Sequence, residues 1–284
     1  MITMLAVDLI LVNGKIWTGI PEFRFAEAVA IRGERIVAVG TTSMVESLAT
    51  ESTRRIDLQK RLVTPGFIDN HVHFVSGGLQ LASVQLRDAA TPQEFARRIG
   101  DYAKTLPKGR WITGGDWDHE RWAPVELPTR RMIDALTPDH PVFVSRLDGH
   151  MALANSLALK MAGVTRETPD PPGGAIVRDE DGELTGVLKD NAMSPVSAIV
   201  PEPTIDDRVT AARAAMKEAA RVGVTAFCDM SGGDAAFEDL RAYQRLQRDG
   251  ALSSRVYLFV PLASSHRLSS AGIDRGFGNS MLRI

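Results

Sequence analysis

The spacing of hydrophobic and polar residues changes near Phe67, and this change divides the chain into two parts. Before it, short apolar runs separated by turn residues predict an all-β module, a small sheet or β-sandwich, over residues 1–66. Asn13-Gly14 separates two of these runs and is the strongest short hairpin signal, and Gly33 marks a second hairpin. A short helix is expected around residues 42–48. The strands that we expect in this module are residues 9–12, 15–17, 28–31, 35–39, 55–58 and 61–63.

Longer helical periods alternate with short strands after Phe67. Thr91-Pro92-Gln93-Glu94 is a capping box with proline at the first helical position, and Thr129 and Thr204 each precede a further helical period. The helix after Thr204 is expected to end at Gly223. Because strand and helix alternate in the last third, we predict a parallel sheet covered by helices. The further strands that we expect are residues 111–113, 142–144, 175–178, 183–188, 224–229 and 255–260.

The segment 65–74 reads as a buried strand that carries a His-x-His pair at its far end. Side chains alternate between the faces of a strand, so Asp69, His71 and His73 share one face. Zn–N bonds are only about 2.0–2.1 Å long, so two such imidazoles can converge on one cation, with a carboxylate supporting them. Two histidines can also lie in a half-polar strand without any metal. The Pro65-Gly66 turn and the position of Asp69 favour the metal site.

Composition narrows the class of protein. A chain of 284 residues with 44% hydrophobic and 24% charged residues is typical of a soluble globular protein with one or two domains. The net charge of −2 indicates neither a nucleic-acid partner nor an acidic membrane surface. No apolar run approaches the roughly 20 residues of a membrane span, and residues 1–12 read as a strand and not as a signal peptide. The single cysteine, Cys228, fits a reducing compartment, so we expect a cytoplasmic protein.

Several short motifs occur together with the His-x-His strand, and the whole set resembles the amidohydrolase superfamily. More narrowly, it is similar to the YtcJ-like branch of the family-3 amidohydrolases. The motifs are Gly114-Gly115-Asp116-Trp117-Asp118, Arg146-Leu147-Asp148-Gly149-His150, Asn155-Ser156-Leu157-Ala158-Leu159, Gly186-Val187-Leu188 and Gly223-Val224-Thr225-Ala226. The resemblance implies an α/β fold: a (β/α)8 TIM barrel flanked by a β-sandwich. Residues 67–284 would be the N-terminal portion of the barrel, with an α/β insertion at about 75–203.

The resemblance also implies a chemistry. His71 and His73 would bind a divalent metal, with zinc expected, at the carboxyl end of the first barrel strand. Metal-bound hydroxide would then hydrolyse an amide-like C–N bond in a small-molecule substrate. An esterase, lactonase or deaminase on the same scaffold is the alternative reaction, because the same hydroxide serves all of them.

The chain departs from the family pattern after its third predicted barrel strand. The remaining family ligands, a lysine and two histidines, and the aspartate that handles the proton would all fall after Ile284, so the catalytic residues stay unassigned. We expect a portion of a chain roughly twice as long. A half barrel completed by a partner, including a homo-oligomer, and a non-catalytic fragment or assembly module are the alternatives.

Other polar residues are candidates for the substrate pocket or for support of the metal ligands. Asp148 and His150 follow a strand, on a loop suited to line a cleft, although His150 could equally bond to nearby backbone. Asp116 and Trp117 could wall a pocket, whereas Trp122 is expected to anchor the insertion. Two further residues are expected to have minor roles only: Lys189 precedes the strand at which the family lysine would occur, and Asp229 ends the second predicted barrel strand.

Overall fold

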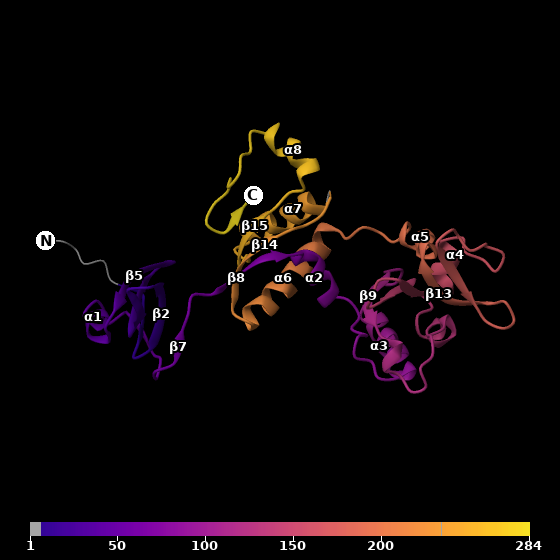
Figure 1. Cartoon of the computed structure of the whole chain (residues 1–284), viewed down its shortest axis with the longest axis horizontal. Helices are drawn as coiled ribbons and strands as arrows, with labels where there is room; N and C mark the ends of the chain where they lie inside the picture. Colours follow the sequence, from indigo (N-terminus) through magenta and orange to yellow (C-terminus); the bar gives the residue numbers. More distant parts are fainter. Residues whose placement is uncertain (1–6, 234) are drawn as a thin grey trace. The chain divides into compact units, whose positions relative to one another are not determined.

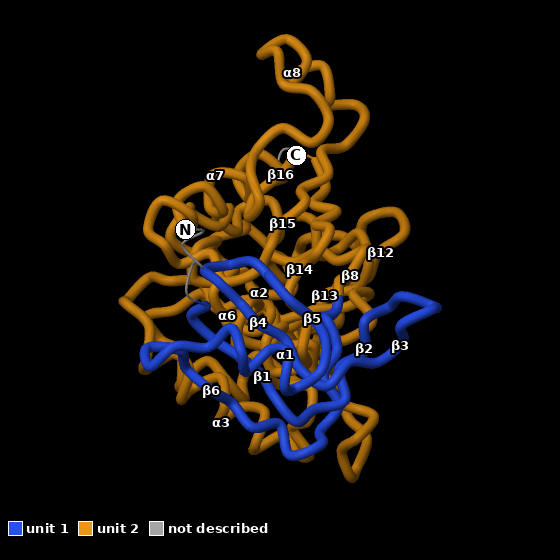
Figure 2. The backbone as a smooth tube through the Cα atoms, turned by 90° about the vertical axis from the view of Figure 1, so that its left-hand side faces the viewer, with its two compact units in different colours: residues 1–67 blue, residues 68–284 orange. Residues whose placement is uncertain are grey.

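The computed structural model describes residues 7–233 and 235–284. The chain forms two compact units that divide after Phe67 (Figures 1 and 2). The first unit contains two small β-sheets, and the second contains a four-stranded and a five-stranded sheet together with helices. Among the described residues, no helix combines the length and the apolar character needed to cross a membrane.

The first unit is built from a four-stranded sheet with the order β5-β4-β1-β6 and a three-stranded sheet with the order β3-β2-β7. Ile16, Val29 and Val63 belong to one hydrophobic cluster that draws on both sheets. The elements are β1 (Leu9–Val12), β2 (Lys15–Ile20), β3 (Phe23–Ala26), β4 (Ala28–Arg32), β5 (Arg35–Gly40), α1 (Thr42–Glu46), β6 (Arg54–Asp57) and β7 (Leu62–Val63). The hairpin predicted around Gly33 is confirmed, since β4 and β5 pair antiparallel.

The hairpin predicted at Asn13-Gly14 is wrong. Strand β1 pairs with β4 and β6, whereas β2 pairs with β3 and β7, so this turn carries the chain from one sheet to the other. The backbone N–H groups after the turn bond to later segments, Gly14 to Glu27 and Lys15 to Arg61, instead of closing a two-strand ladder. The strand expected over residues 1–12 is present from Leu9 onward, and residues 1–6 lie outside the described part of the chain.

The second unit contains a four-stranded sheet with the order β16-β15-β14-β8. Strands β14, β15 and β16 are parallel, which confirms the parallel sheet predicted from the alternation of strands and helices. Side chains of α2, α6 and α7 form one core with β14 and β15, as the close arrangement of these elements in Figure 1 illustrates. The elements are β8 (Phe67–Val72), α2 (Phe74–Leu81), α6 (Ile205–Arg221), β14 (Val224–Asp229), α7 (Ala235–Arg248), β15 (Arg255–Leu258), η5 (Leu262–Ser264), α8 (Ser265–Ser269) and β16 (Leu282–Arg283).

Local sequence explains where the main helix of this core begins. The sequence predicts a helix after Thr204, and in the structure Thr204 and Asp207 form a reciprocal capping box at the start of α6. The helix ends next to Gly223, which adopts a φ of 79°. Helices α2 and α6 approach so closely that a Cβ atom on Gly78 would lie 2.1 Å from the carbonyl oxygen of Ala211. Only glycine therefore fits at this crossing.

Strand β8 was predicted to be buried, and this prediction is wrong for most of its length. Phe67 and Ile68 are 60% and 68% exposed, and residues 69–71 are exposed as well. The reason is the position of β8 at the edge of its sheet, where β14 is its neighbour on one side. Such edges are usually covered in parallel sheets.

A five-stranded sheet with the order β12-β13-β11-β10-β9 lies between α2 and α6 in the sequence. The hairpin predicted over residues 175–188 is confirmed by the antiparallel pairing of β12 with β13. The capping box predicted at Thr91 is half formed: Thr91 accepts the backbone N–H of Glu94 at 3.1 Å at the start of α3, but the Glu94 carboxylate accepts the N–H of Ala90 instead of that of Thr91. The elements are α3 (Pro92–Ala103), β9 (Ile112–Trp117), η1 (His119–Arg121), η2 (Arg130–Met132), η3 (Asp134–Leu136), β10 (Val142–Arg146), β11 (Met151–Ala154), α4 (Ser156–Met161), β12 (Gly174–Arg178), β13 (Leu184–Asp190), η4 (Asn191–Met193) and α5 (Ser194–Ser197).

The helix predicted after Thr129 is replaced by two single 3-10 turns, η2 and η3. Asp134 is the first residue of η3, and its carboxylate accepts hydrogen bonds from the backbone N–H and the hydroxyl of Ser156 at 2.8 and 2.7 Å. These bonds fix the centre of the segment to the start of α4, next to Ile133, whose φ of −118° separates the two turns. The amphipathic period was therefore correct, but the element is not one α-helix.

Candidate metal centre

His71 and His73 lie at the carboxyl end of β8, where the strand passes into α2. Their imidazole rings have centroids 5.8 Å apart and an interplanar angle of 82°. Both residues are exposed, and the carboxylate of Asp69 accepts a hydrogen bond from the backbone N–H of His71 at 3.1 Å. The two rings therefore lie close to each other at an accessible strand end, as a shared cation would require.

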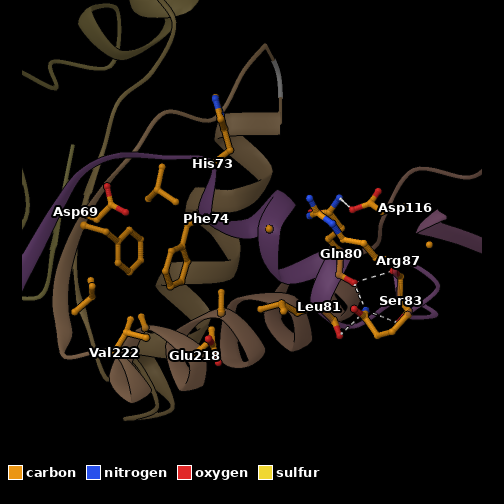
Figure 3. Close-up of a pocket in the computed structure, with 18 of the residues that line it drawn as sticks. Asp69, His73, Phe74, Gln80, Leu81, Ser83, Arg87, Asp116, Glu218 and Val222 are labelled. Carbon is orange, nitrogen blue, oxygen red and sulfur yellow. Dashed lines mark hydrogen bonds between the residues drawn. The ribbon is translucent and has the colours of Figure 1, made fainter. Parts of the chain in front are cut away.

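A cavity of about 410 Å³ begins beside His73 (Figure 3). One side is mainly apolar and is formed by Phe74 and by Ala215 and Ala219 of α6, with Glu218 of the same helix beside them. The other side carries polar side chains from α2 and the end of β9. Asp69 and Asp116 also line this cavity. Gln80 donates a hydrogen bond to the carboxylate of Asp116 at 2.5 Å. The structure thus places three of the candidate residues, Asp69, His73 and Asp116, around one space.

Asp116 has an unusual backbone. Its φ is 51°, in the left-handed region that non-glycine residues seldom adopt. It follows two glycines, Gly114 and Gly115, that also have positive φ. This backbone turns the end of β9 so that the Asp116 carboxylate faces Gln80 of α2. The Gly-Gly-Asp motif therefore has a definite local role, which is to direct this carboxylate.

Asp229 lies at the end of β14 and is completely buried. Its carboxylate accepts hydrogen bonds from the backbone N–H of Phe74 at 3.2 Å and from the hydroxyl of Tyr243 at 2.6 Å, and the hydroxyl oxygen of Ser231 lies 3.1 Å away. Burial raises the pKa of Asp229, and the bonds from Tyr243 and Phe74 act in the opposite direction. Burial, together with the nearby Asp229, raises the pKa of Tyr243. Sequence reasoning placed Asp229 at this strand end but missed its partners.

Trp117 was expected to wall the pocket, but the structure places it in the hydrophobic core. Its side chain is completely buried, and its indole N–H donates to the carbonyl of Val144 at 2.9 Å. It also makes an edge contact with the ring of Phe95. Trp122 is 2% exposed and bonds to the carbonyl of Ala89 at 2.9 Å, which agrees with the anchoring role expected for it.

Asp148 and His150 lie on the loop between β10 and β11, and neither lines the cavity beside His73. The His150 ring pairs with Asp190 at 2.9 Å, and both side chains are exposed. Asp148 pairs with Arg146 and accepts the backbone N–H of His150 at 3.0 Å. Partial burial tends to raise the pKa of Asp148, but the bonds from His150 and Arg146 outweigh it and lower the pKa. This loop is thus held by ion pairs of its own.

The two histidines fit part of a metal site. Within residues 7–233 and 235–284, no group of three or more His, Cys, Asp or Glu side chains is arranged to hold a metal ion. Metal sites with histidine ligands usually have three or four protein ligands. His71 and His73 can therefore provide two of them, and the rest of the ligand set is not found in the described part of the chain.

Comparison with known proteins gives the family. Residues 54–282 match the model of the amidohydrolase family. The chain is 30% identical to the putative amidohydrolase YtcJ of Bacillus subtilis, over 87% of this chain and 47% of that protein. It is 33% identical to the N-substituted formamide deformylase of Arthrobacter pascens, over 65% of this chain and 34% of that protein.

A solved structure is also similar. An uncharacterized metal-dependent hydrolase from Pyrococcus furiosus superposes with a TM-score of 0.75 at 26% sequence identity, over 97% of this chain and 55% of that one. The chain spans about half the length of the curated relatives that it matches. The match of the family model over most of the sequence confirms the resemblance drawn from the motifs, and the chain belongs to the amidohydrolase family.

Proposed function

We propose that this chain supplies part of the active site of a metal-dependent hydrolase that cleaves an amide-like C–N bond in a small molecule. The observation that carries the proposal is the pair of imidazoles 5.8 Å apart at the end of β8, next to a cavity of about 410 Å³. The names of the similar proteins, an amidohydrolase and a formamide deformylase, support the choice of bond. Ester, lactone or deamination chemistry on the same scaffold is the alternative that a substrate screen would separate.

His71 and His73 would hold a divalent cation, and zinc suits imidazole ligands. When bound, such a cation supplies Lewis acidity, which polarises a carbonyl group and makes water more acidic. Other residues of this chain would position the site and contact the substrate. Asp69 fixes the backbone at His71 through its hydrogen bond, and the apolar side of the cavity excludes water from part of a bound substrate. Asp116, held by Gln80, offers an acceptor to a polar group of that substrate.

The proposal includes an architecture. Residues 67–284 would form the N-terminal portion of a (β/α)8 barrel in the cytoplasm, with residues 75–203 inserted after its first strand and residues 1–66 as a β-sandwich. The order of β8, β14 and β15 within one sheet supports this assignment, since successive barrel strands are neighbours. The remaining ligands and the group that handles the proton would come from elsewhere.

The experiment is a zinc titration of the purified protein, followed through the imidazole signals in NMR spectra of histidine-labelled protein. We expect the signals of His71 and His73 to shift together, and the replacement His71→Ala to abolish the zinc-dependent shift at His73. His266→Ala is a matched control, because His266 is also exposed but its ring nitrogen bonds to the carbonyl of Ala263. Unchanged zinc binding after His71→Ala would contradict the proposal.

A second candidate is a non-catalytic module that assembles with another chain. The observation that favours it is the exposed edge of β8, where Phe67 and Ile68 are 60% and 68% exposed. Light scattering combined with metal analysis separates the two candidates. A stable, metal-free dimer would favour the assembly module, whereas a stoichiometric amount of bound zinc would favour the hydrolase.

A further inference from the structure

Helix α2 begins in an unusual way. It starts at Phe74, so His73 is at the N-cap position, with φ −97° and ψ 78°. The first backbone N–H groups of a helix have no partner within the helix, and the side chain of an N-cap Ser, Thr, Asp or Asn usually accepts from them. The His73 side chain makes no capping hydrogen bond. Another group must therefore fulfil this role.

Asp229 fulfils it from a neighbouring strand. Its Oδ1 accepts the backbone N–H of Phe74 at 3.2 Å, although the two residues are 155 positions apart in the sequence. The next residue, Met230, donates its backbone N–H to the carbonyl of Val72 at 2.8 Å. The backbone on both sides of His73 is thus tied to the end of β14. A carboxylate at a helix N-terminus is also electrostatically favourable.

The carboxylate of Asp229 is itself held in place. The hydroxyl of Tyr243 donates to it at 2.6 Å, and the hydroxyl oxygen of Ser231 lies 3.1 Å from it. Ser231 has one hydroxyl hydrogen, which is nearer to Asp239, at 2.5 Å. The ring of Phe74 stacks on Phe227 with centroids 3.5 Å apart. A buried carboxylate is costly unless its oxygens are satisfied, and here both are. The position of Phe74 relative to β14 is therefore determined by several contacts at once.

From these contacts we propose that Asp229 is a positioning residue for His73: it caps α2 in place of the His73 side chain and so leaves the imidazole free to bind the cation. This inference rests on the proposed metal function and deepens it. It assigns a role in metal binding to a residue that does not touch the metal. The same arrangement explains how a histidine can occupy a position at which capping side chains are preferred.

The test compares two buried caps in the same protein. Asp229→Ala removes the cap of α2, and Asn155→Ala removes a similar cap, since the Asn155 side chain is 1% exposed and accepts the N–H of Ala158 in α4 at 2.9 Å. We expect both variants to unfold at lower urea concentration. Only Asp229→Ala should also weaken zinc binding at His71 and His73, by about 10-fold, the lower end for outer-shell groups. Asp229→Asn keeps an acceptor for Phe74 and should restore most of the affinity.

Each outcome of these measurements either supports or overturns the positioning role. Wild-type zinc affinity in a folded Asp229→Ala protein would overturn the positioning role while leaving the metal site intact. An equal loss of affinity in Asn155→Ala would also overturn it, because the effect would then be one of general stability. If Asp229→Ala does not fold, Tyr243→Phe removes one donor to Asp229, and an unchanged affinity there would overturn the role. Absence of zinc binding in the wild-type protein would overturn the proposed function, and this inference with it.

Discussion

Arg208 donates a hydrogen bond to Asp239 at 2.6 Å, and only 8% and 2% of their side-chain areas remain exposed. The pair connects α6 to α7 beneath the sheet that carries the histidines. Each buried charge is stable here only because the opposite charge pairs with it, and removal of one would leave an uncompensated charge in the interior.

Asp239→Ala should therefore lower the free energy of unfolding by about 3–5 kcal/mol. The double replacement Arg208→Met with Asp239→Leu should recover much of this loss, since no unpaired charge is left. Urea unfolding of the two variants measures both values. Asp249→Ala is the control, because Asp249 is exposed near the end of α7. A loss at Asp239 no larger than that at Asp249 would contradict the prediction.

Two adjacent glycines in α2 should respond in opposite directions. A Cβ on Gly78 would lie 2.1 Å from the carbonyl oxygen of Ala211, whereas a Cβ on Gly77 meets no atom within 4 Å. Gly78→Ala should destabilise the protein by about 1–3 kcal/mol through overpacking. Gly77→Ala should stabilise it by up to about 1 kcal/mol, because alanine favours the helix. Thermal unfolding of both variants tests this contrast, and equal shifts of either sign would refute it.

Stability should depend on pH through His119. Its ring lies between Trp117 and Trp122, and burial, aided by the nearby Arg146, lowers its pKa below 6.5. As the pH falls, the unfolded chain takes up this proton first. The contribution of neutral His119 is thus complete above pH 6.5 and is lost on acidification.

The replacement His119→Gln removes this titration. The difference in melting temperature between wild type and His119→Gln should therefore be largest near pH 8 and should shrink toward about pH 5. Thermal scans at several pH values provide the measurement. A difference that stays constant across this range would show that the protonation of His119 does not contribute.

Substitutions at two neighbouring residues at the end of β9 should affect stability very differently, because one residue is in the core and the other lines the cavity. Trp117→Ala should cost about 3–5 kcal/mol, because the side chain is completely buried and bonds to Val144. Asp116→Gly should be neutral or slightly stabilising, since its φ of 51° suits glycine. Urea unfolding distinguishes the two. A mild effect of Trp117→Ala would contradict the prediction.

Elements defined by nearby residues could be predicted from the sequence. The N-caps at Thr91 and Thr204 were correct because the N–H groups that they accept, those of Glu94 and Asp207, are only three residues away. The Asn13-Gly14 hairpin was wrong because its strands find partners much farther along the chain. A turn signal states that the chain reverses, but it does not state which strand pairs with which.

In the candidate site, too, features that depend on nearby residues were predicted, and features that depend on distant residues were missed. His71 lies in β8 and His73 directly follows the last residue of this strand, so their proximity follows from a separation of only two residues along the chain. The bond between Asp229 and Phe74 depends on how β14 lies beside β8, which no local pattern contains. Trp117 was misplaced because an indole with a polar N–H suits a pocket wall and a core equally well.

The turn at His73 can form only late during synthesis of the chain. The ribosome adds His71 and His73 to the chain long before it adds Asp229 and Tyr243, the two side chains that complete this turn. While the chain is still growing, α2 therefore lacks the acceptor that defines its first residue. The mature position of the His73 ring must therefore await the late part of translation, and the proposed cation would be bound only after that.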